Sequence, residues 1–239
     1  MYQSIISLGA WCQVAEQLRL HQLPRTLSPF EWTVAPLDAV TAVLKDDGRH
    51  LCADVRIEGE ERHPLCQHYG LLYPHDFHPP HGDKSQWMEI TPDELVAAQS
   101  KYAHKMSEFR RACRANDGRI AFIRMGGEAL PAYPWPYLHD AKALTATKIN
   151  QLVADLETYC GHNDFDLFIF LHEEWHPLDM DAILPSNVKV LQRPPVSPPV
   201  EWFGHKAIWT EILQTIGLIG QAEGKSPETH RAGTVNEMC

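Results

Sequence analysis

The residue with the clearest chemical potential is Cys12, which follows an apolar run at 4–8 and a turn that begins at Gly9. The residues after Cys12 show helical periodicity, so we expect the cysteine at the start of a helix. Backbone N–H groups at a helix start have no intrahelical partner, and the helix dipole favours an anion there. Both effects would stabilise a thiolate, which makes Cys12 a candidate nucleophile. The alternative is an inert buried cysteine, since free cysteines are often core residues.

A cysteine nucleophile needs a base, because a thiol with a pKa of about 8.5 is mostly protonated at neutral pH. Two histidines are candidates for this role. His75 lies in a proline-preceded loop beside Asp76, and His172 follows a predicted strand. Adjacent residues on an extended segment point apart, so Asp76 need not be the group that orients the His75 ring.

Periodic patterns predict the elements that must position these residues. Four short apolar runs predict buried strands at 4–8, 119–125, 166–171 and 187–191. Amphipathic patterns predict helices at 12–20, 36–44, 91–113, 141–159 and 201–219. The alternation favours an α/β fold, with a mostly parallel, Rossmann-like sheet covered by helices on both faces. We assign residues 1–222 to a single domain and residues 223–239, which lack apolar periodicity, to a flexible tail.

The stretch at 48–90 fits this alternation poorly and is rich in His and Pro. We interpret it as an insertion with irregular structure or a short hairpin that lies over the sheet, of the kind that often binds ligands. It carries potential zinc ligands at His63, Cys66, His68, His75, His78 and His81. Their spacing matches no zinc finger, and a His172-x-x-x-His176 pair is followed by Pro177, which would end a helix. We therefore expect no metal and no cofactor, and keep a zinc-dependent enzyme as an alternative.

In an open parallel sheet, ligands bind beyond the carboxyl ends of the strands. Cys12, Arg124, His172 and Arg193 each lie at or after the end of a predicted strand, so we expect them to converge on one edge. The two arginines could bind a carboxylate or phosphate group of a substrate. Salt bridges at the sheet edge would explain the same two residues.

Composition excludes several classes of protein. The formal net charge is −10 and no Lys/Arg cluster reverses it locally, which argues against nucleic-acid binding. The six cysteines are widely spaced without a CxxC pair, as expected of reduced thiols. Because a basic leader and any long apolar run are lacking, we expect a cytoplasmic protein with no membrane contact.

Several short motifs occur together in the first half of the chain. They are Leu8-Gly9-x-x-Cys12, Ser28-Pro29-Phe30-Glu31-Trp32, His75-Asp76-Phe77, Lys101-Tyr102 and Phe122-Ile123-Arg124. This set resembles a bacterial domain family of unknown function that is described as putative papain-like cysteine peptidases. The resemblance covers residues 4–125 and continues loosely to about residue 209.

The resemblance implies a nucleophile at Cys12 and a base at His75, with Asp76 and Glu31 as candidate orienting carboxylates. Glu31 stands where the family pattern has Asp. The separation of the cysteine and the histidine is much shorter than in papain itself. A strand that leads directly into the cysteine turn also suits a Rossmann-like sheet better than a papain fold.

These observations point to thiol-based acyl chemistry. Cys12 would attack a carbonyl of a small-molecule, acyl or peptidyl substrate to form a thioester, with His75 or His172 as the base. Backbone amides around Trp11 and Gln13 would stabilise the oxyanion, and Trp11 could wall the pocket. We thus expect a cysteine hydrolase or acyltransferase, and the opposing hypothesis is a non-catalytic ligand-binding α/β protein.

Overall fold

The computed structural model describes residues 2–10, 12–58, 63–77, 90–115, 117–126, 144–171, 183–192 and 205–220. The expectations for Trp11, His78, His81, His172, His176, Arg193 and the tail at 223–239 lie outside these residues. Within the described residues, no helix combines the length and the apolar character that crossing a membrane would require.

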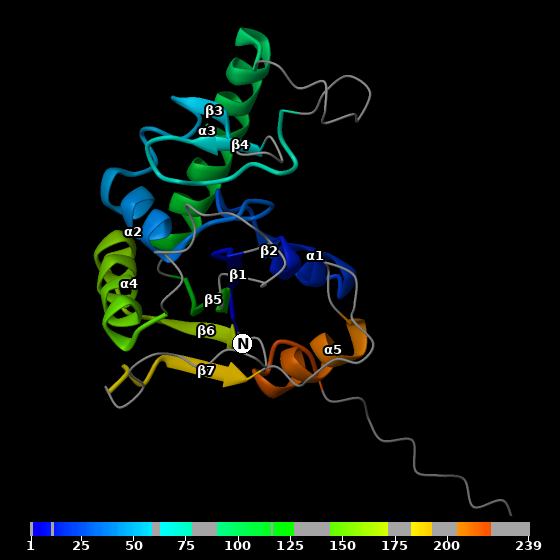
Figure 1. Cartoon of the computed structure of the whole chain (residues 1–239). Coiled ribbons are helices and arrows are strands. Elements are labelled where there is room, and N and C mark those ends of the chain that lie inside the picture. The colour runs from blue at the N-terminus through cyan, green and yellow to red at the C-terminus, as the bar shows by residue number, and fades with distance from the viewer. Residues whose placement is uncertain are drawn as a thin grey trace, which may run out of the picture.

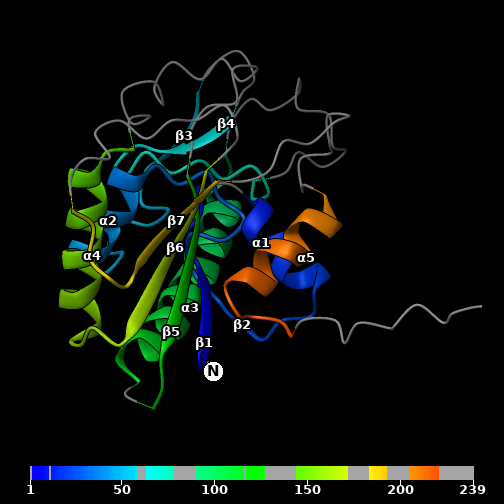
Figure 2. The same ribbon diagram turned by 90° about the horizontal axis from the view of Figure 1, so that it is seen from below.

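The centre of the structure is a five-stranded sheet in which every neighbouring pair is parallel. Its order is β2 (Arg25–Thr26), β1 (Ser4–Ser7), β5 (Ile120–Gly126), β6 (Phe165–Leu171) and β7 (Val188–Gln192). The four predicted strands are therefore confirmed within a residue or two at each end. The short edge strand β2 was not predicted. The mostly parallel α/β fold is confirmed (Figures 1 and 2).

Alternating side chains along the strands build a hydrophobic core on each face of the sheet. On β5, Phe122 belongs to one core and Ile123 to the other. Parallel strands that are buried on both faces need apolar residues at nearly every position, which is why these strands read as continuous apolar runs. Helices α1 (Gln13–Leu20) and α5 (Lys206–Thr215) cover one face.

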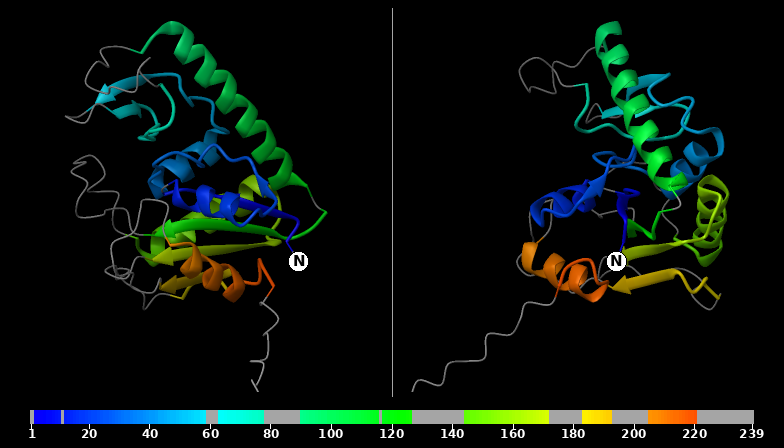
Figure 3. Two further views of the ribbon diagram at one scale, coloured as in Figure 1. Left: turned by 90° about the vertical axis from the view of Figure 1, so that its right-hand side faces the viewer. Right: turned by 180° about the vertical axis from the view of Figure 1, so that it is seen from behind.

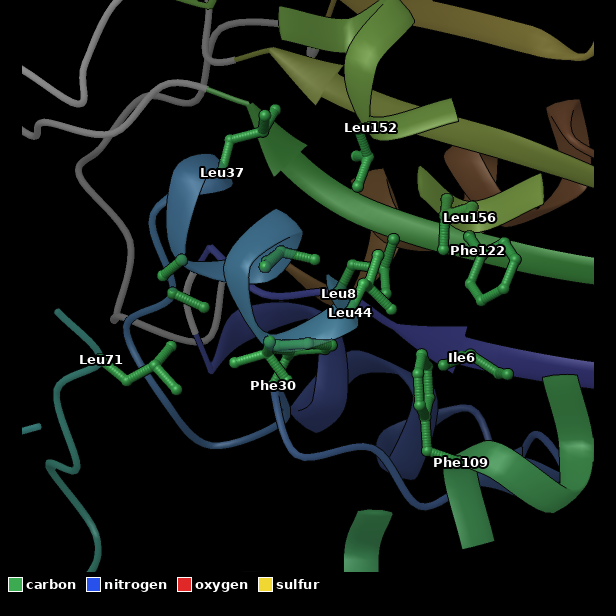
Figure 4. Close-up of a cluster of buried hydrophobic side chains, with 14 of the residues drawn as sticks. Ile6, Leu8, Phe30, Leu37, Leu44, Leu71, Phe109, Phe122, Leu152 and Leu156 are labelled. Carbon is green, nitrogen blue, oxygen red and sulfur yellow. The ribbon is translucent and has the colours of Figure 1, made fainter. Parts of the chain in front are cut away.

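The other face carries α2 (Leu37–Asp46), α3 (Pro92–Arg114) and α4 (Ala146–Cys160). Figure 4 shows part of this core, where Phe109 of α3 lies near Ile6 of β1, and Leu152 of α4 lies beside β5. Helix α3 begins with a capping box: the Thr91 hydroxyl accepts a hydrogen bond from the Glu94 backbone N–H, and the Glu94 carboxylate accepts one from the Thr91 backbone N–H.

The insertion contains an antiparallel hairpin made of β3 (Val55–Glu58) and β4 (His63–Cys66). Of the two interpretations of this stretch, the short hairpin is the one that the described residues bear out. The expected place over the sheet is wrong, because the hairpin lies beside the N-terminal half of α3, away from the main sheet (Figure 3). Backbone bonds between Val34 and Leu72 attach the segment that follows the hairpin to the loop before α2. This attachment brings residues near position 75 to the start of α1.

Candidate active site

Cys12 is the N-cap residue of α1 and lies just beyond the carboxyl end of β1, as the sequence predicted. The turn between them depends on Gly9, which has a φ of +82° in the left-handed region. A Cβ atom at this position would lie 2.9 Å from the Cβ of Ala35, so space also demands glycine. The turn leaves Cys12 almost fully buried, with 7% of its surface exposed.

Backbone hydrogen bonds hold this turn from two sides. The Met125 N–H on β5 donates to the Gly9 carbonyl, and the Ala35 N–H donates to the Ala10 carbonyl, each over 3.0 Å. The turn is therefore clamped between β5 and the loop that precedes α2. Such support fixes the position of Cys12 more tightly than a free loop would.

Arg124 contributes to the same clamp. Its guanidinium is fully buried and donates to the Leu8 carbonyl over 2.8 Å and to the Ala35 carbonyl over 2.9 Å. The expected place of Arg124 at the sheet edge is correct, but its side chain is directed at backbone carbonyls in the interior. This geometry suits positioning of the cysteine turn rather than contact with a substrate.

The side chain of His75 meets Cys12. Its Nε2 atom lies 3.2 Å from the Cys12 Sγ atom, across 63 positions of sequence. His75 is exposed, whereas the sulfur next to it is buried. The Trp32 ring stands edge-on to the imidazole, with centroids 5.5 Å apart and an interplanar angle of 89°. The cysteine, the histidine and the tryptophan thus form one contiguous group.

Asp76 is anchored to α3. Its Oδ1 atom accepts a hydrogen bond from Lys101 Nζ over 2.6 Å, and its Oδ2 atom accepts one from the Tyr102 hydroxyl over 2.9 Å. Asp76 is buried, and Tyr102 is fully buried. These bonds fasten the turn that carries His75 to the helix. Asp76 therefore supports the position of His75 through the backbone of this turn.

Glu31 lies in the segment just before Trp32 and is also buried. Its carboxylate forms an ion pair with Arg25, and its backbone carbonyl accepts a hydrogen bond from Lys105 Nζ over 3.1 Å. Burial raises the pKa of the Glu31 carboxyl and lowers the pKa of the Lys105 ammonium, because each charge is partly removed from water. The bonds of Glu31 hold the Trp32 segment in place.

Burial also dominates the pKa of the Cys12 thiol. It raises the pKa of the Cys12 thiol to about 12, although a hydrogen bond with the Cys12 backbone and the charge of Lys105 act in the opposite direction. The sequence predicted a thiolate that the helix start would stabilise. In the structure the loss of hydration outweighs that effect, so the thiol stays protonated at neutral pH. Its S–H can then donate to Nε2 of His75.

Other sequence expectations have separate outcomes. Gln13 is buried in the first turn of α1, directly after Cys12. The sequence analysis assigned no role in the site to three further residues. They are Trp32, which contacts the imidazole, and Lys101 and Tyr102, which donate hydrogen bonds to Asp76. The motifs Glu31-Trp32 and Lys101-Tyr102 were visible in the sequence, but their contacts depend on the tertiary fold. A positive φ of 65° at Trp32 is the kind of uncommon backbone that often occurs at functional sites.

Comparison with known proteins identifies the family of this chain. The comparisons with curated proteins and with solved structures found no match. Residues 3–154 match a family described as "Putative papain-like cysteine peptidase (DUF1796)", and they include Cys12, Trp32, His75 and Asp76. Because the match covers more than half of the 239 residues, the chain belongs to this family.

Proposed function

We propose that this protein is a cysteine hydrolase in which Cys12 is the nucleophile and His75 is the general base. The observation that carries the proposal is the 3.2 Å separation of Cys12 Sγ and His75 Nε2. A nucleophile and a base within hydrogen-bond reach are the geometric signature of covalent acyl catalysis. The family description of this chain supports the same class of chemistry.

The first half of the reaction forms a thioester. Nε2 of His75 removes the thiol proton as Sγ of Cys12 attacks the carbonyl carbon of the substrate, which gives a tetrahedral oxyanion and an imidazolium. Backbone N–H groups in the first turn of α1, beginning at Gln13, would stabilise the oxyanion, because they lie at the positive end of the helix dipole. The imidazolium then donates its proton to the leaving amine or alkoxide as the carbonyl re-forms.

The second half releases the acyl group. Neutral His75 removes a proton from water as the water oxygen attacks the thioester carbon, and the same proton returns to the Cys12 sulfur as it departs. An alcohol or amine in place of water would make the protein an acyltransferase with the same residues. The substrate class is an acyl or peptidyl group, and the family description favours hydrolysis.

The raised pKa of Cys12 determines how the pair works. A protonated thiol is a weak nucleophile, so the proton must pass to His75 during the attack rather than before it. The exposed imidazole can exchange its proton with a leaving group or with water, while the buried sulfur is shielded. Trp32 at the ring edge restricts the rotation of the imidazole.

The experiment that tests the proposal is acyl trapping. The wild-type protein and the variants Cys12→Ala, His75→Gln and Cys52→Ala are incubated with p-nitrophenyl acetate and with a peptidyl p-nitrophenyl ester. Acyl adducts are located by intact-mass and peptide-mapping mass spectrometry. Cys52 is a matched control, because burial likewise raises the pKa of its thiol to about 12.

We expect an adduct on Cys12 in the wild-type protein and in Cys52→Ala, and none in Cys12→Ala. His75→Gln should slow acylation by about 10²- to 10⁴-fold, the usual contribution of a general base. Equal acylation of the wild-type protein and Cys12→Ala would overturn the proposal. Absence of any adduct with both esters would favour the non-catalytic alternative, in which Cys12 is a core residue.

A further inference from the structure

A second cluster of polar side chains lies where the end of α2 meets the turn after β4. Its members are Asp46, the last residue of α2, His50 four positions later, and His68 beyond the hairpin. One ligand atom from each residue lies within 4.8 Å of the other two. The cluster shares no residue with the Cys12–His75 pair, so an inference from it does not depend on the proposed function.

The Tyr69 hydroxyl bonds to the side chain of Asp46 and to the backbone of His50. The hydroxyl oxygen lies 2.6 and 2.7 Å from the two carboxylate oxygens of Asp46, to which it donates. The same oxygen accepts a hydrogen bond from the His50 backbone N–H over 3.0 Å. The Gly48 N–H donates to Asp46 as well, over 3.1 Å. The carboxylate is thus held by outer partners, as the ligands of metal sites usually are.

The imidazole rings of His50 and His68 are stacked at a tilt. The ring centroids of His50 and His68 are 4.0 Å apart, at an interplanar angle of 35°. Nε2 of His68 is 3.8 Å from Oδ2 of Asp46. Two ligand atoms on one zinc ion, each bonded at about 2.0–2.1 Å, lie about 3.3 Å apart in a tetrahedron. The ligand atoms of the cluster lie within 4.8 Å of one another, so they must move closer together to bind one ion. The His68 ring is the exposed member of the three and contacts the rings of His50 and Tyr69.

We propose that Asp46, His50 and His68 form a binding site for Zn²⁺ or a closely similar divalent transition-metal ion. Two imidazoles and one carboxylate suit zinc better than magnesium or calcium, which prefer oxygen ligands alone. His68 is exposed, so water can complete the coordination of the ion. A bound ion would join the hairpin to α2 and thereby stabilise the insertion.

The test uses the full chain without a histidine tag, stripped of metal with a chelator. Binding of ZnCl₂ is followed by calorimetry, and binding of CoCl₂ is followed by visible absorption, which reports the ligands and the geometry. The variants are His68→Ala, Asp46→Asn and Tyr69→Phe. The control is His104→Ala, because His104 is an exposed histidine on α3 outside the cluster. Thermal melting of each metal-free variant establishes that it is folded.

We expect one zinc ion bound per chain, with a melting temperature that rises on zinc addition. His68→Ala and Asp46→Asn should each weaken zinc binding at least 10-fold, and Tyr69→Phe should weaken it about 10- to 100-fold by loosening Asp46. His104→Ala should bind zinc as the wild-type protein does. Zinc affinity that is unchanged in His68→Ala would place the ion elsewhere and overturn the proposal, as would the absence of binding at millimolar zinc.

Discussion

The side chains of His75 and Asp76, which are adjacent in sequence, point to opposite sides of one turn. The His75 ring is exposed and reaches Cys12, whereas the Asp76 carboxylate is buried against Lys101 and Tyr102. The turn is thus fastened to α3 on its inner side and presents the His75 imidazole to Cys12 on its outer side. The anchoring of Asp76 therefore determines where the imidazole stands.

A first prediction concerns the Tyr102 hydroxyl. Tyr102→Phe removes one of the bonds to Asp76 and leaves that carboxylate less firmly held, so the His75 turn should loosen. We expect a loss of about 1–3 kcal/mol in the free energy of unfolding and a clear fall in the rate of Cys12 acylation. Urea denaturation and the acyl-trapping assay measure the two effects.

Tyr159→Phe is the matched control for this substitution. The Tyr159 hydroxyl also donates to a carboxylate, that of Asp47, over 2.6 Å, but it lies on α4 away from the cysteine. Tyr159→Phe should lower stability by a similar amount and leave acylation unchanged. If both variants lost acylation in proportion to their stability, the anchoring role of Tyr102 would be refuted.

Much of the fold could be predicted because burial between two helix layers imposes a simple pattern. Strands β5 and β6 are buried at every position and β1 at nearly every one, so they must be apolar on both faces, and that pattern is visible without any tertiary information. Edge strand β7 keeps enough apolar residues to be recognised, although Lys189 is exposed. Edge strand β2 could not be found in this way, since Arg25 and Thr26 are neither apolar nor numerous enough to form a pattern. The exact beginning of α4 depends on the Thr145 cap, which apolar periodicity does not mark.

The site was predictable only in part. The position of Cys12 followed from a strand that runs into a helix, but the choice of His75 came from the resemblance to a family. The contact itself joins residues 63 positions apart. The role of Arg124 depends on the carbonyls of Leu8 and Ala35, which the fold brings to it and no local pattern reveals. Likewise, the protonation of Cys12 is decided by burial, which the sequence does not quantify.

A second prediction follows from that protonation. Because burial raises the pKa of Cys12 to about 12, its alkylation by iodoacetamide should be slow at neutral pH and should keep rising through alkaline pH. A preformed thiolate–imidazolium pair would instead give a plateau near neutral pH. The measurement is the rate of labelling at Cys12 against pH, followed by peptide mapping.

Cys52 provides the internal reference for this pH profile. Burial raises its pKa to a similar value, but its hydrogen-bond partner is Tyr73 rather than a histidine. Both cysteines should therefore respond to pH in the same direction in the absence of substrate. A Cys12 profile with a neutral plateau, beside a Cys52 profile without one, would contradict the protonated thiol and indicate the ion pair.

A third prediction concerns Gly9. Gly9→Ala would place a Cβ atom 2.9 Å from the Cβ of Ala35 and would force alanine into the left-handed region. We expect the turn before Cys12 to shift, with a loss of acylation larger than the loss of stability alone explains. Gly161→Ala is the control, because Gly161 also has a positive φ, of 78°, but no atom lies within 4 Å of its would-be Cβ.

The Gly161 variant should lose only about 1 kcal/mol in the free energy of unfolding, from the strained backbone, and should retain normal acylation. Circular dichroism melts and the acyl-trapping rate separate the two cases. Normal acylation in a folded Gly9→Ala protein would mean that the position of Cys12 does not depend on this turn.

A fourth prediction concerns Asp47, the residue that follows α2. Its carboxylate joins three helices, because it bonds to Arg110 on α3 and to Tyr159 on α4. Burial alone would raise the pKa of its carboxyl, but hydrogen bonds from Arg110 and Tyr159 outweigh that effect and hold the pKa below its ordinary value. A carboxyl with a lowered pKa in the folded state stabilises the fold above its unfolded pKa of about 3.9. That contribution is lost as the pH falls through the folded value.

Asp47→Asn tests this with little disturbance of the backbone, because the residue has a φ of 60° and asparagine tolerates the left-handed region. The variant should be less stable than the wild-type protein at neutral pH, and the difference should be smaller at acid pH, where the Asp47 carboxyl becomes protonated. The effect should be modest, since the carboxylate is partly exposed and the pair is screened by water. Asp117→Asn, at an exposed position, should show no such difference at either pH. Urea denaturation at neutral and at acid pH measures these differences. If the stability difference for Asp47→Asn stayed the same at both pH values, the charge of Asp47 would not be what joins the helices.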